Sequence, residues 1–433
     1  MKLTAFTPIA VSIASFLGSV SAVPAQPKDA RALSEMAQRG AELYERLQAR
    51  TPHPAWFEER VASHVKRGES PIASDPTQLT AASHAKGGQN YTGYQDPVPA
   101  EFTRNPKYAA FSAFDFHSLN LGVHQEQIEL DLFLNAVKQF GDEDFRQLNL
   151  TSDDQALLHF FGLQEIGHAE VLSNLLGPKA PQICKYNYPY SDLRGYLDFN
   201  EQLTRWGESG VYGFLPSLDN RANAQILLQS IATEARQQYT FRQWLGVQPV
   251  TQWFETGLPQ AYAWTLLSRY ITSCPSHNIP VQFTIFPRLD VQNSANIAQI
   301  GAQAGGAAIT HDTDSFVQEG ETVKLAWDSP GKDQGPYGQK TAVLADDKTP
   351  RYAAFLSQYN VTYSPLEDIS HDGSRSYGST KVPGGLVFSD QKQPIVAGTM
   401  FVSITNSNSH YTPLNLTLIN GATIAGPAIF QAS

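Results

Sequence analysis

A carboxylate and an imidazole stand three residues apart in the heptapeptide Gln164-Glu165-Ile166-Gly167-His168-Ala169-Glu170. Residues three and four positions apart lie on the same side of an α-helix, so Glu165 and His168 share one face. The apolar members of that face are Leu158, Phe161, Ala169 and Leu172. A glutamate and a histidine therefore occupy positions at which a core-facing helix would ordinarily bury hydrophobic side chains.

Other segments with helical periodicity repeat this pattern. Glu126 and Glu234 each lie in the middle of an apolar stripe, and Glu208 lies beside the apolar Val211. The stripe residues around the first two are Leu119, Val123, Leu130 and Phe133, and Leu227, Ile231 and Phe241. The spacings predict helices over residues 108–140, 152–177, 191–213 and 217–246, and a fifth over 253–273. Together they predict a helical bundle over residues 106–278.

Several carboxylates that meet in one dry core cannot all ionise without a cation between them. Four-helix bundles with a di-metal site supply a Glu from each of two helices and a Glu-x-x-His pair from each of the other two. Here the second such pair ends in glutamine, which is a weaker ligand than imidazole. The pattern predicts one or two metal ions, or a relic site whose carboxylates are satisfied by hydrogen bonds. The candidate ligands are Glu126, Glu165, His168, Glu208, Glu234 and Gln237.

The beginning of the chain has the layout of a secretory signal peptide. A positive charge at Lys2 is followed by an apolar run to about Val20, which closes on the small residues Ser21 and Ala22. We therefore expect residues 1–22 to be removed and the mature protein to be secreted, either extracellular or in the cell wall. No later segment offers the roughly 20 mainly apolar residues that a spanning helix needs, so we expect no membrane span.

Composition bears on the partners and on the covalent state. The net charge of −10 and the lack of a Lys/Arg cluster argue against nucleic acid as a partner. The two cysteines, Cys184 and Cys274, predict a disulfide, because two thiols in an oxidising compartment usually pair. Four Asn-x-Thr sequons are expected glycosylation sites on a secreted chain. They begin at Asn90, Asn149, Asn360 and Asn415.

The segments on either side of the bundle have a different texture. Residues 23–105 predict an N-terminal helix followed by an extended strap rich in Gly, Pro, Ser, Thr and Asn. Beyond the bundle, short alternating stretches between turn residues, at 281–286, 322–327 and 401–405, are typical of an antiparallel sandwich. Residues 279–433 are therefore expected to form an all-β domain. The predicted fold class is α+β and multidomain, with a helical bundle followed by a C-terminal antiparallel β-sandwich-like domain.

Several stretches resemble the ferritin-like domain proteins, in particular a secreted fungal branch of that family. Residues 119–129 resemble the first helix of these proteins, and residues 164–170 resemble their second-helix motif. Residues 205–214 and 233–238, the pair Cys274-Pro275 and residues 424–428 are similar to the fungal branch, which includes stress-response and late-sexual-development proteins. The resemblance implies a ferritin-like bundle, secretion and a fungal source.

The resemblance leaves two functions open. In the first, a secreted ferritin-like protein binds iron or manganese, as one or two ions, and acts in stress response or development. In the second, a non-catalytic protein of the cell surface keeps a degenerate site without metal and binds wall polysaccharide or another protein. Aromatic residues of the β domain could stack on sugars, although such residues more often pack in a core; they include Trp327, Tyr337, Tyr352, Tyr359 and Tyr363. The sequence assigns no catalytic residue and decides neither enzymatic activity nor oligomeric state.

Overall fold

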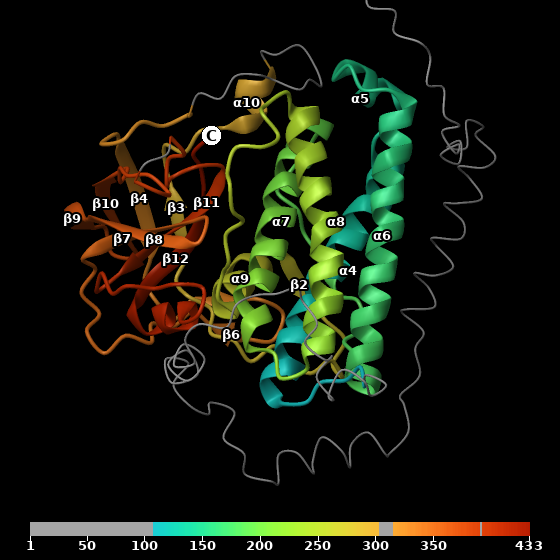
Figure 1. Cartoon of the computed structure of the whole chain (residues 1–433), viewed down its shortest axis with the longest axis horizontal. Helices are drawn as coiled ribbons and strands as arrows, with labels where there is room; N and C mark the ends of the chain where they lie inside the picture. The colour runs from blue at the N-terminus through green and yellow to red at the C-terminus, as the bar shows by residue number, and fades with distance from the viewer. Residues whose placement is uncertain (1–106, 303–314, 390–391) are drawn as a thin grey trace, which may run out of the picture.

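The computed structural model describes residues 107–302, 315–389 and 392–433. The expected signal peptide, the N-terminal helix and strap of residues 23–105, and the sequon at Asn90 lie outside these ranges. In the described part a helical bundle is followed by antiparallel sheets, so the chain is an α+β multidomain protein, as its sequence predicts (Figure 1). No helix among these residues is both long and apolar enough to cross a membrane.

Four long helices of the described part run side by side and form the bundle (Figure 1). They are α4 (Ala113–Gln139), α6 (Ser152–Leu176), α7 (Leu193–Phe214) and α8 (Arg221–Leu245). Helix α4 packs against α6, and α7 packs against α8. Shorter helices accompany them, namely α5 (Asp142–Gln147), α9 (Gln260–Leu267) and α10 (Ile297–Ala302).

Side-chain caps set where the long helices begin. Ser112, Thr151 and Asn220 accept hydrogen bonds from first-turn backbone N–H groups at the starts of α4, α6 and α8. Helix α8 ends at Gly246, whose φ of 84° lies in the left-handed region that glycine adopts without strain. Helices α4 and α8 begin several residues after the predicted starts. The capping residues determine where these helices begin, whereas the prediction used the apolar spacing.

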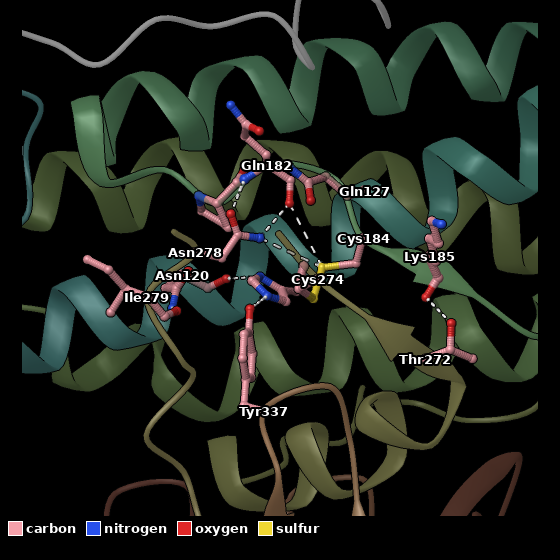
Figure 2. The surroundings of a disulfide bond; sticks show 12 residues. Asn120, Gln127, Gln182, Cys184, Lys185, Thr272, Cys274, Asn278, Ile279 and Tyr337 are labelled. Carbon is pink, nitrogen blue, oxygen red and sulfur yellow. Dashed lines mark hydrogen bonds between the residues drawn. A yellow bond between two sulfur atoms is a disulfide. The ribbon is translucent and has the colours of Figure 1, made fainter. Parts of the chain in front are cut away.

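The fifth predicted helix is much shorter than residues 253–273, because only α9 is helical there. A 3₁₀ turn follows α9 and leads directly into strand β2 (Ile271–Ser273). Strand β2 pairs antiparallel with β1 (Lys185–Tyr186). The predicted disulfide between Cys184 and Cys274 is present beside this short ladder (Figure 2).

Two antiparallel sheets of four strands each form the C-terminal part. The strand orders are β3-β4-β10-β9 and β12-β11-β7-β8. The first sheet contains β3 (Leu289–Val291), β4 (Thr322–Asp328), β9 (Glu367–His371) and β10 (Arg375–Lys381). The second contains β7 (Tyr352–Ser357), β8 (Asn360–Pro365), β11 (Thr399–Thr405) and β12 (Thr423–Gln431). A separate ladder joins β5 (Asp333–Gln334) to β6 (Gln339–Lys340).

The two large sheets bury a common core between their inner faces. It includes Leu325 of β4, Val402 of β11 and Phe430 of β12. The outer face of the second sheet is also buried, because alternate residues of β11 and β7 face the bundle. Phe401 and Leu356, which are cross-strand partners, belong to the bundle core. The second sheet therefore lies between the bundle and the first sheet.

The predicted strand over residues 281–286 is wrong, because this segment is irregular in the structure. Val281, Ile285 and Phe286 are buried in the bundle core. The N–H of Phe286 donates to Oγ1 of Thr265 on α9 at 3.0 Å. The alternation of this segment therefore reflects packing against the helices rather than membership in a sheet.

Helix α7 approaches the segment before α9 very closely at Gly213. A Cβ atom at this position would overlap the carbonyl oxygen of Leu258. The N–H of Leu258 in turn donates to the carbonyl oxygen of Ser209, one turn earlier on α7, at 2.8 Å. Glycine is required at residue 213 because a neighbouring backbone passes where a side chain would begin.

A buried polar network joins the bundle to the second sheet. Arg242 of α8 is 1% exposed, and its Nη1 lies 3.2 Å from Oε1 of Glu201 on α7. Arg242 also donates to Oγ1 of Thr399 on β11 at 3.1 Å and to the main-chain oxygen of Ser433 at 2.6 Å. Gln431 of β12 donates to the second oxygen of Glu201 at 3.0 Å. Each polar group in this dry contact therefore has a partner from across the boundary between helices and strands.

Candidate metal centre

Three helices bring four ligand side chains together in the interior of the bundle. Glu126 comes from α4, Glu165 and His168 come from α6, and Glu234 comes from α8. One ligand atom of each residue lies within 4.8 Å of the others. The three carboxylate residues are 2%, 0% and 1% exposed, respectively. The structure thus gathers four of the six candidate ligands that the sequence predicts.

Apolar layers close the cluster on both sides along the helix axes. On one side, each of the three helices contributes a residue to one hydrophobic cluster, namely Val123, Leu172 and Ile231. On the other side, three phenylalanine rings pack with centroids 5.7 to 6.3 Å apart, namely Phe133, Phe161 and Phe241. Each helix therefore carries apolar, polar and apolar residues in turn along one face, which keeps water away from the polar layer.

His168 lies at the centre of the carboxylates. Its Nδ1 is 2.9 Å from Oε2 of Glu165, 3.3 Å from Oε2 of Glu126 and 3.8 Å from Oε1 of Glu234. Its Nε2 is 3.1 Å from Oγ1 of Thr233. Burial by itself lowers the pKa of His168, but the charges of Glu165 and Glu126 raise it to about 12. Without a metal ion, this histidine is therefore an imidazolium held by carboxylates.

The carboxylates of the cluster differ in their acidity. Burial and the charge of Glu234 raise the pKa of Glu126 well above its ordinary value. Burial and the charges of Glu129 and Glu165 do the same for Glu234. Burial would also raise the pKa of Glu165, but the charge of His168 and its hydrogen bond turn the net shift downward. A single imidazolium therefore compensates the negative charge of one of these carboxylates and not that of all of them.

The sequence reasoning missed Glu129, which also faces this layer. It lies three residues after Glu126 on α4 and is 0% exposed. Burial and the charges of Glu165 and Glu126 raise the pKa of Glu129. Its Oε1 accepts a hydrogen bond from Gln125 at 3.1 Å, whereas its buried Oε2 accepts none from the described residues. The spacing in the sequence could have indicated Glu129, because Glu126 and Glu129 are three residues apart, as are Glu165 and His168.

Comparison with known proteins agrees with this arrangement of helices. The family model of the ferritin-like domain matches residues 114–247, which include every residue of the cluster. Protein rds1 of Schizosaccharomyces pombe is 38% identical over 392 residues, a match that covers 85% of this chain and 96% of rds1. The chain belongs to the fungal ferritin-like family of rds1. The predicted resemblance to a fungal ferritin-like family is thus confirmed.

Gln237 takes the position at which a ferritin-like bundle would offer its second histidine. It is 0% exposed, and its Nε2 lies 2.5 Å from Oε1 of Glu165. Its buried Oε1 has no hydrogen-bond partner in the part of the chain that the structure describes. The amide therefore stabilises the charge of Glu165, and it leaves one oxygen free beside the cluster.

Glu208 lies on α7, the long helix that contributes no residue to the group of four ligands. It is 0% exposed, and its Oε1 is 2.8 Å from Nη1 of Arg205. Arg205 also pairs with Glu255. Burial raises the pKa of Glu208 to about 7, although the charge of Arg205 opposes the shift. Glu208, which the sequence predicts as a ligand, is thus paired with an arginine and does not belong to the group of four.

The donor set fits a divalent transition metal. Carboxylate oxygens from three helices surround one imidazole nitrogen, and such mixed oxygen and nitrogen sites suit manganese and iron. Among residues 107–302, 315–389 and 392–433, no group donates a hydrogen bond to the buried oxygens Oε2 of Glu129 and Oε1 of Gln237. Buried polar atoms usually have a partner, so free oxygens beside several carboxylates are the expected donors for a cation.

The sequons of the described part lie outside this centre. Asn149 follows α5 and is exposed, whereas Asn360 and Asn415 are partly buried. Oδ1 of Asn415 accepts a hydrogen bond from the N–H of Thr412 at 2.7 Å. Glycosylation at these sites stays a prediction.

Proposed function

We propose that this chain is a secreted ferritin-like protein that binds iron or manganese in its bundle core and acts in stress response or development. The observation that carries the metal proposal is the dry cluster of Glu126, Glu165, His168 and Glu234, with Glu129 beside it. Iron or manganese bound there would supply one-electron redox chemistry. The chain itself would hold the ion, and the apolar layers would exclude water from it.

Each residue of the cluster has a distinct part in this proposal. Glu126 and Glu234 would bind the ion from α4 and α8, and Glu129 would supply an additional oxygen. His168 would ligate through Nδ1, the nitrogen that faces the carboxylates. Thr233 would then orient the imidazole through Nε2, as outer-shell partners of ligating histidines commonly do.

Secretion is proposed from the signal-like residues 1–22 and is supported by the disulfide between Cys184 and Cys274. Disulfides persist in oxidising compartments, which include the cell exterior. The role in stress response or development is proposed from the resemblance to the fungal branch. Fractionation of a culture, with detection of the chain in the medium and in the wall, tests the location. Retention of the intact chain inside the cells would contradict it.

Elemental analysis of the purified protein tests the metal proposal. After growth with iron and manganese we expect about one or two ions per chain, as for a single or paired site. The Glu165→Ala variant should lose this metal while its helical circular dichroism is retained. The control is Glu143→Ala, because Glu143 lies on the surface of α5 and pairs only with Arg146 in an exposed contact. Wild-type protein without metal, or full metal content in Glu165→Ala, would contradict the proposal.

A second candidate function is binding of wall polysaccharide, and an exposed aromatic cluster favours it. Trp253, Phe254 and Phe388 are 49%, 41% and 44% exposed, and Phe254 packs on the partly buried Tyr359 with ring centroids 5.0 Å apart. Trp327, by contrast, is 4% exposed and belongs to the sandwich core. Sedimentation with insoluble wall glucan and chitin tests this function. Trp253→Ala should weaken binding, and equal binding by this variant would contradict the role.

A further inference from the structure

A histidine of α4 lies beside the disulfide, away from the carboxylate cluster. A ring nitrogen of His124 and the sulfur atoms of Cys184 and Cys274 lie within 4.8 Å of one another. Cys184 stands just before β1, and Cys274 stands just after β2 (Figure 2). One helix and two connecting segments thus bring together a nitrogen and two sulfurs in a partly buried position.

The imidazole of His124 is held in a fixed orientation. The residue is 1% exposed, and its Nδ1 is 3.1 Å from the carbonyl oxygen of Asn120. Its Nε2 is 2.8 Å from the hydroxyl of Tyr337. The ring of Trp264 meets the imidazole edge-on, with centroids 5.8 Å apart. Because a carbonyl oxygen can only accept, Nδ1 carries the proton and Nε2 accepts from Tyr337, so a metal ion bound by this ring would take the place of the Tyr337 hydroxyl at Nε2.

The two cysteine segments are also held together by contacts other than the disulfide. Strands β1 and β2 pair, and Oγ1 of Thr272 donates to the carbonyl oxygen of Lys185 at 3.0 Å (Figure 2). The side-chain amide of Asn278 donates to the carbonyl oxygen of Gln182 at 2.7 Å and accepts from its N–H at 2.9 Å. These hydrogen bonds join the two segments independently of the disulfide.

We propose that Cys184, Cys274 and His124 form a zinc site that becomes able to bind the ion when the disulfide is reduced. A dithiol reductant transfers two electrons: one of its thiolates attacks the sulfur of Cys274, and the sulfur of Cys184 leaves as a thiolate. The second thiolate of the reductant then attacks the reductant's sulfur in this mixed disulfide, Cys274 leaves as the second thiolate, and the reductant ends as its own disulfide. Cys274 is the partly exposed residue and Cys184 is buried, so attack begins at Cys274. Zn²⁺ then binds the two thiolates and one imidazole, and the two protons of the reductant's thiols pass to solvent.

The ligand set matches zinc and differs from that of the carboxylate cluster. Zinc takes cysteine sulfur and histidine nitrogen in tetrahedral sites, and a Cys₂His set leaves one position for water. Carboxylate-rich sites suit manganese and iron, whereas thiolate ligands favour zinc. The zinc site does not depend on the proposed function, because it shares no ligand with the carboxylate cluster.

The full chain is tested in its oxidised and reduced forms. A phosphine reductant opens the disulfide without adding a thiolate, and titration of free thiols verifies the reduction. Equilibrium dialysis against ZnCl₂ should then give about one more zinc ion per chain in the reduced form. Co²⁺ used in place of Zn²⁺ should give a thiolate-to-cobalt charge-transfer band in the reduced form alone. Equal zinc content in both forms would overturn the proposal.

Variants separate this site from the carboxylate cluster. His124→Gln should weaken the thiol-dependent zinc by more than about tenfold, the smallest loss typical even of an outer-shell partner. His159→Gln, which changes another buried histidine on the neighbouring α6, should leave it unchanged. Glu165→Ala should also leave it unchanged, so the two metal proposals fail independently. Undiminished zinc in His124→Gln would remove the histidine from the site and overturn the proposal.

The zinc proposal can also be tested if the chain loses its structure on reduction. If the reduced chain unfolds without metal, zinc added before the reductant should preserve its near-ultraviolet circular dichroism, because binding to the native state stabilises that state. His124→Gln should not be protected in this way. Unfolding of the reduced wild-type chain at the same rate with and without zinc would overturn the proposal.

Discussion

Glu129 lies one helical turn after Glu126, and both carboxylates face the layer that holds Glu165 and Glu234. One imidazolium cannot offset the charge of four carboxylates in a dry interior. Because burial raises the pKa of Glu126, Glu129 and Glu234, the metal-free bundle keeps part of this layer protonated. A divalent cation offers the alternative, in which the carboxylates ionise and bind it.

Thr233→Ala should weaken metal binding without loss of fold. The hydroxyl of Thr233 lies 3.1 Å from Nε2 of His168, and removal of such an outer-shell contact typically costs about 10- to 100-fold in metal affinity. Titration with Fe²⁺ or Mn²⁺ under anaerobic conditions measures the change. Thr240→Ala is the matched control, because the hydroxyl of Thr240 bonds only to the carbonyl oxygen of Arg236 on its own helix. Equal affinities in the two variants would exclude an orienting role for Thr233.

The metal-free protein should become less stable as the pH rises. The folded-state pKa values of Glu126, Glu129 and Glu234 are raised, so their contribution to stability is fully present below the unfolded-state pKa and is lost as the pH rises through the folded-state values. Urea unfolding of the metal-free chain between about pH 5 and pH 8 measures this slope. Metal affinity should rise over the same range, because the ligands release protons on binding.

Glu129→Gln provides the control for this pH dependence. The amide keeps the shape of the side chain and removes one group that titrates, so the slope of stability against pH should become shallower. The metal-free variant should be more stable than the wild type at neutral pH, because the buried amide needs no proton to stay neutral. An unchanged slope would show that Glu129 does not contribute to it.

Among the elements, the sequence predicts the positions of the long helices well. It predicts less well which side chains of each helix face the carboxylate layer. Glu165 and Glu234 were found because each interrupts a clear apolar stripe. Glu129 was missed because residues 118–130 of α4 are all buried, and a helix buried on every side has no periodicity that selects one face. The prediction of a strand over residues 281–286 is wrong for a related reason. The alternating apolar residues of this segment pack against the helices, including α9, and the local sequence does not reveal that contact.

Gly213→Ala should destabilise the protein, although alanine favours helices more than glycine does. Its Cβ would overlap the carbonyl oxygen of Leu258, and such overpacking costs about 1–3 kcal/mol or more. Gly167→Ala is the matched control on α6, because a Cβ there meets no atom of the described residues within 4 Å. That variant should gain about 0.5–1 kcal/mol from helix propensity. Thermal unfolding measures both, and the same sign for the two variants would contradict the close approach.

At the scale of the whole molecule, helices and strands are joined by polar contacts that neither part can satisfy alone. Glu201 is buried on α7, and its partners Thr399 and Gln431 lie about 200 residues further along the chain. Thr399 is also a partner of Arg242. Such pairings depend on how the sheet docks on the bundle, and no local sequence signal encodes them.

Arg242→Met should destabilise the whole chain. The change leaves Glu201 as a buried carboxylate without its cation, and breaking a buried ion pair in this way costs about 3–5 kcal/mol. Arg146→Met, which removes an exposed pair with Glu143, should change stability by less than about 1 kcal/mol. Chemical unfolding followed by circular dichroism compares them. A loss of similar size in both variants would show that the buried network adds no stability.

Strand β11 has neighbouring residues in two different hydrophobic cores, with Val402 between the sheets and Phe401 against the bundle. Because side chains alternate from one residue to the next, deletion of a single residue within β11 would exchange the two faces beyond that point. Both cores would then receive the wrong side chains at once. Over evolutionary time, length changes should therefore be tolerated in the connecting loops and eliminated from this strand.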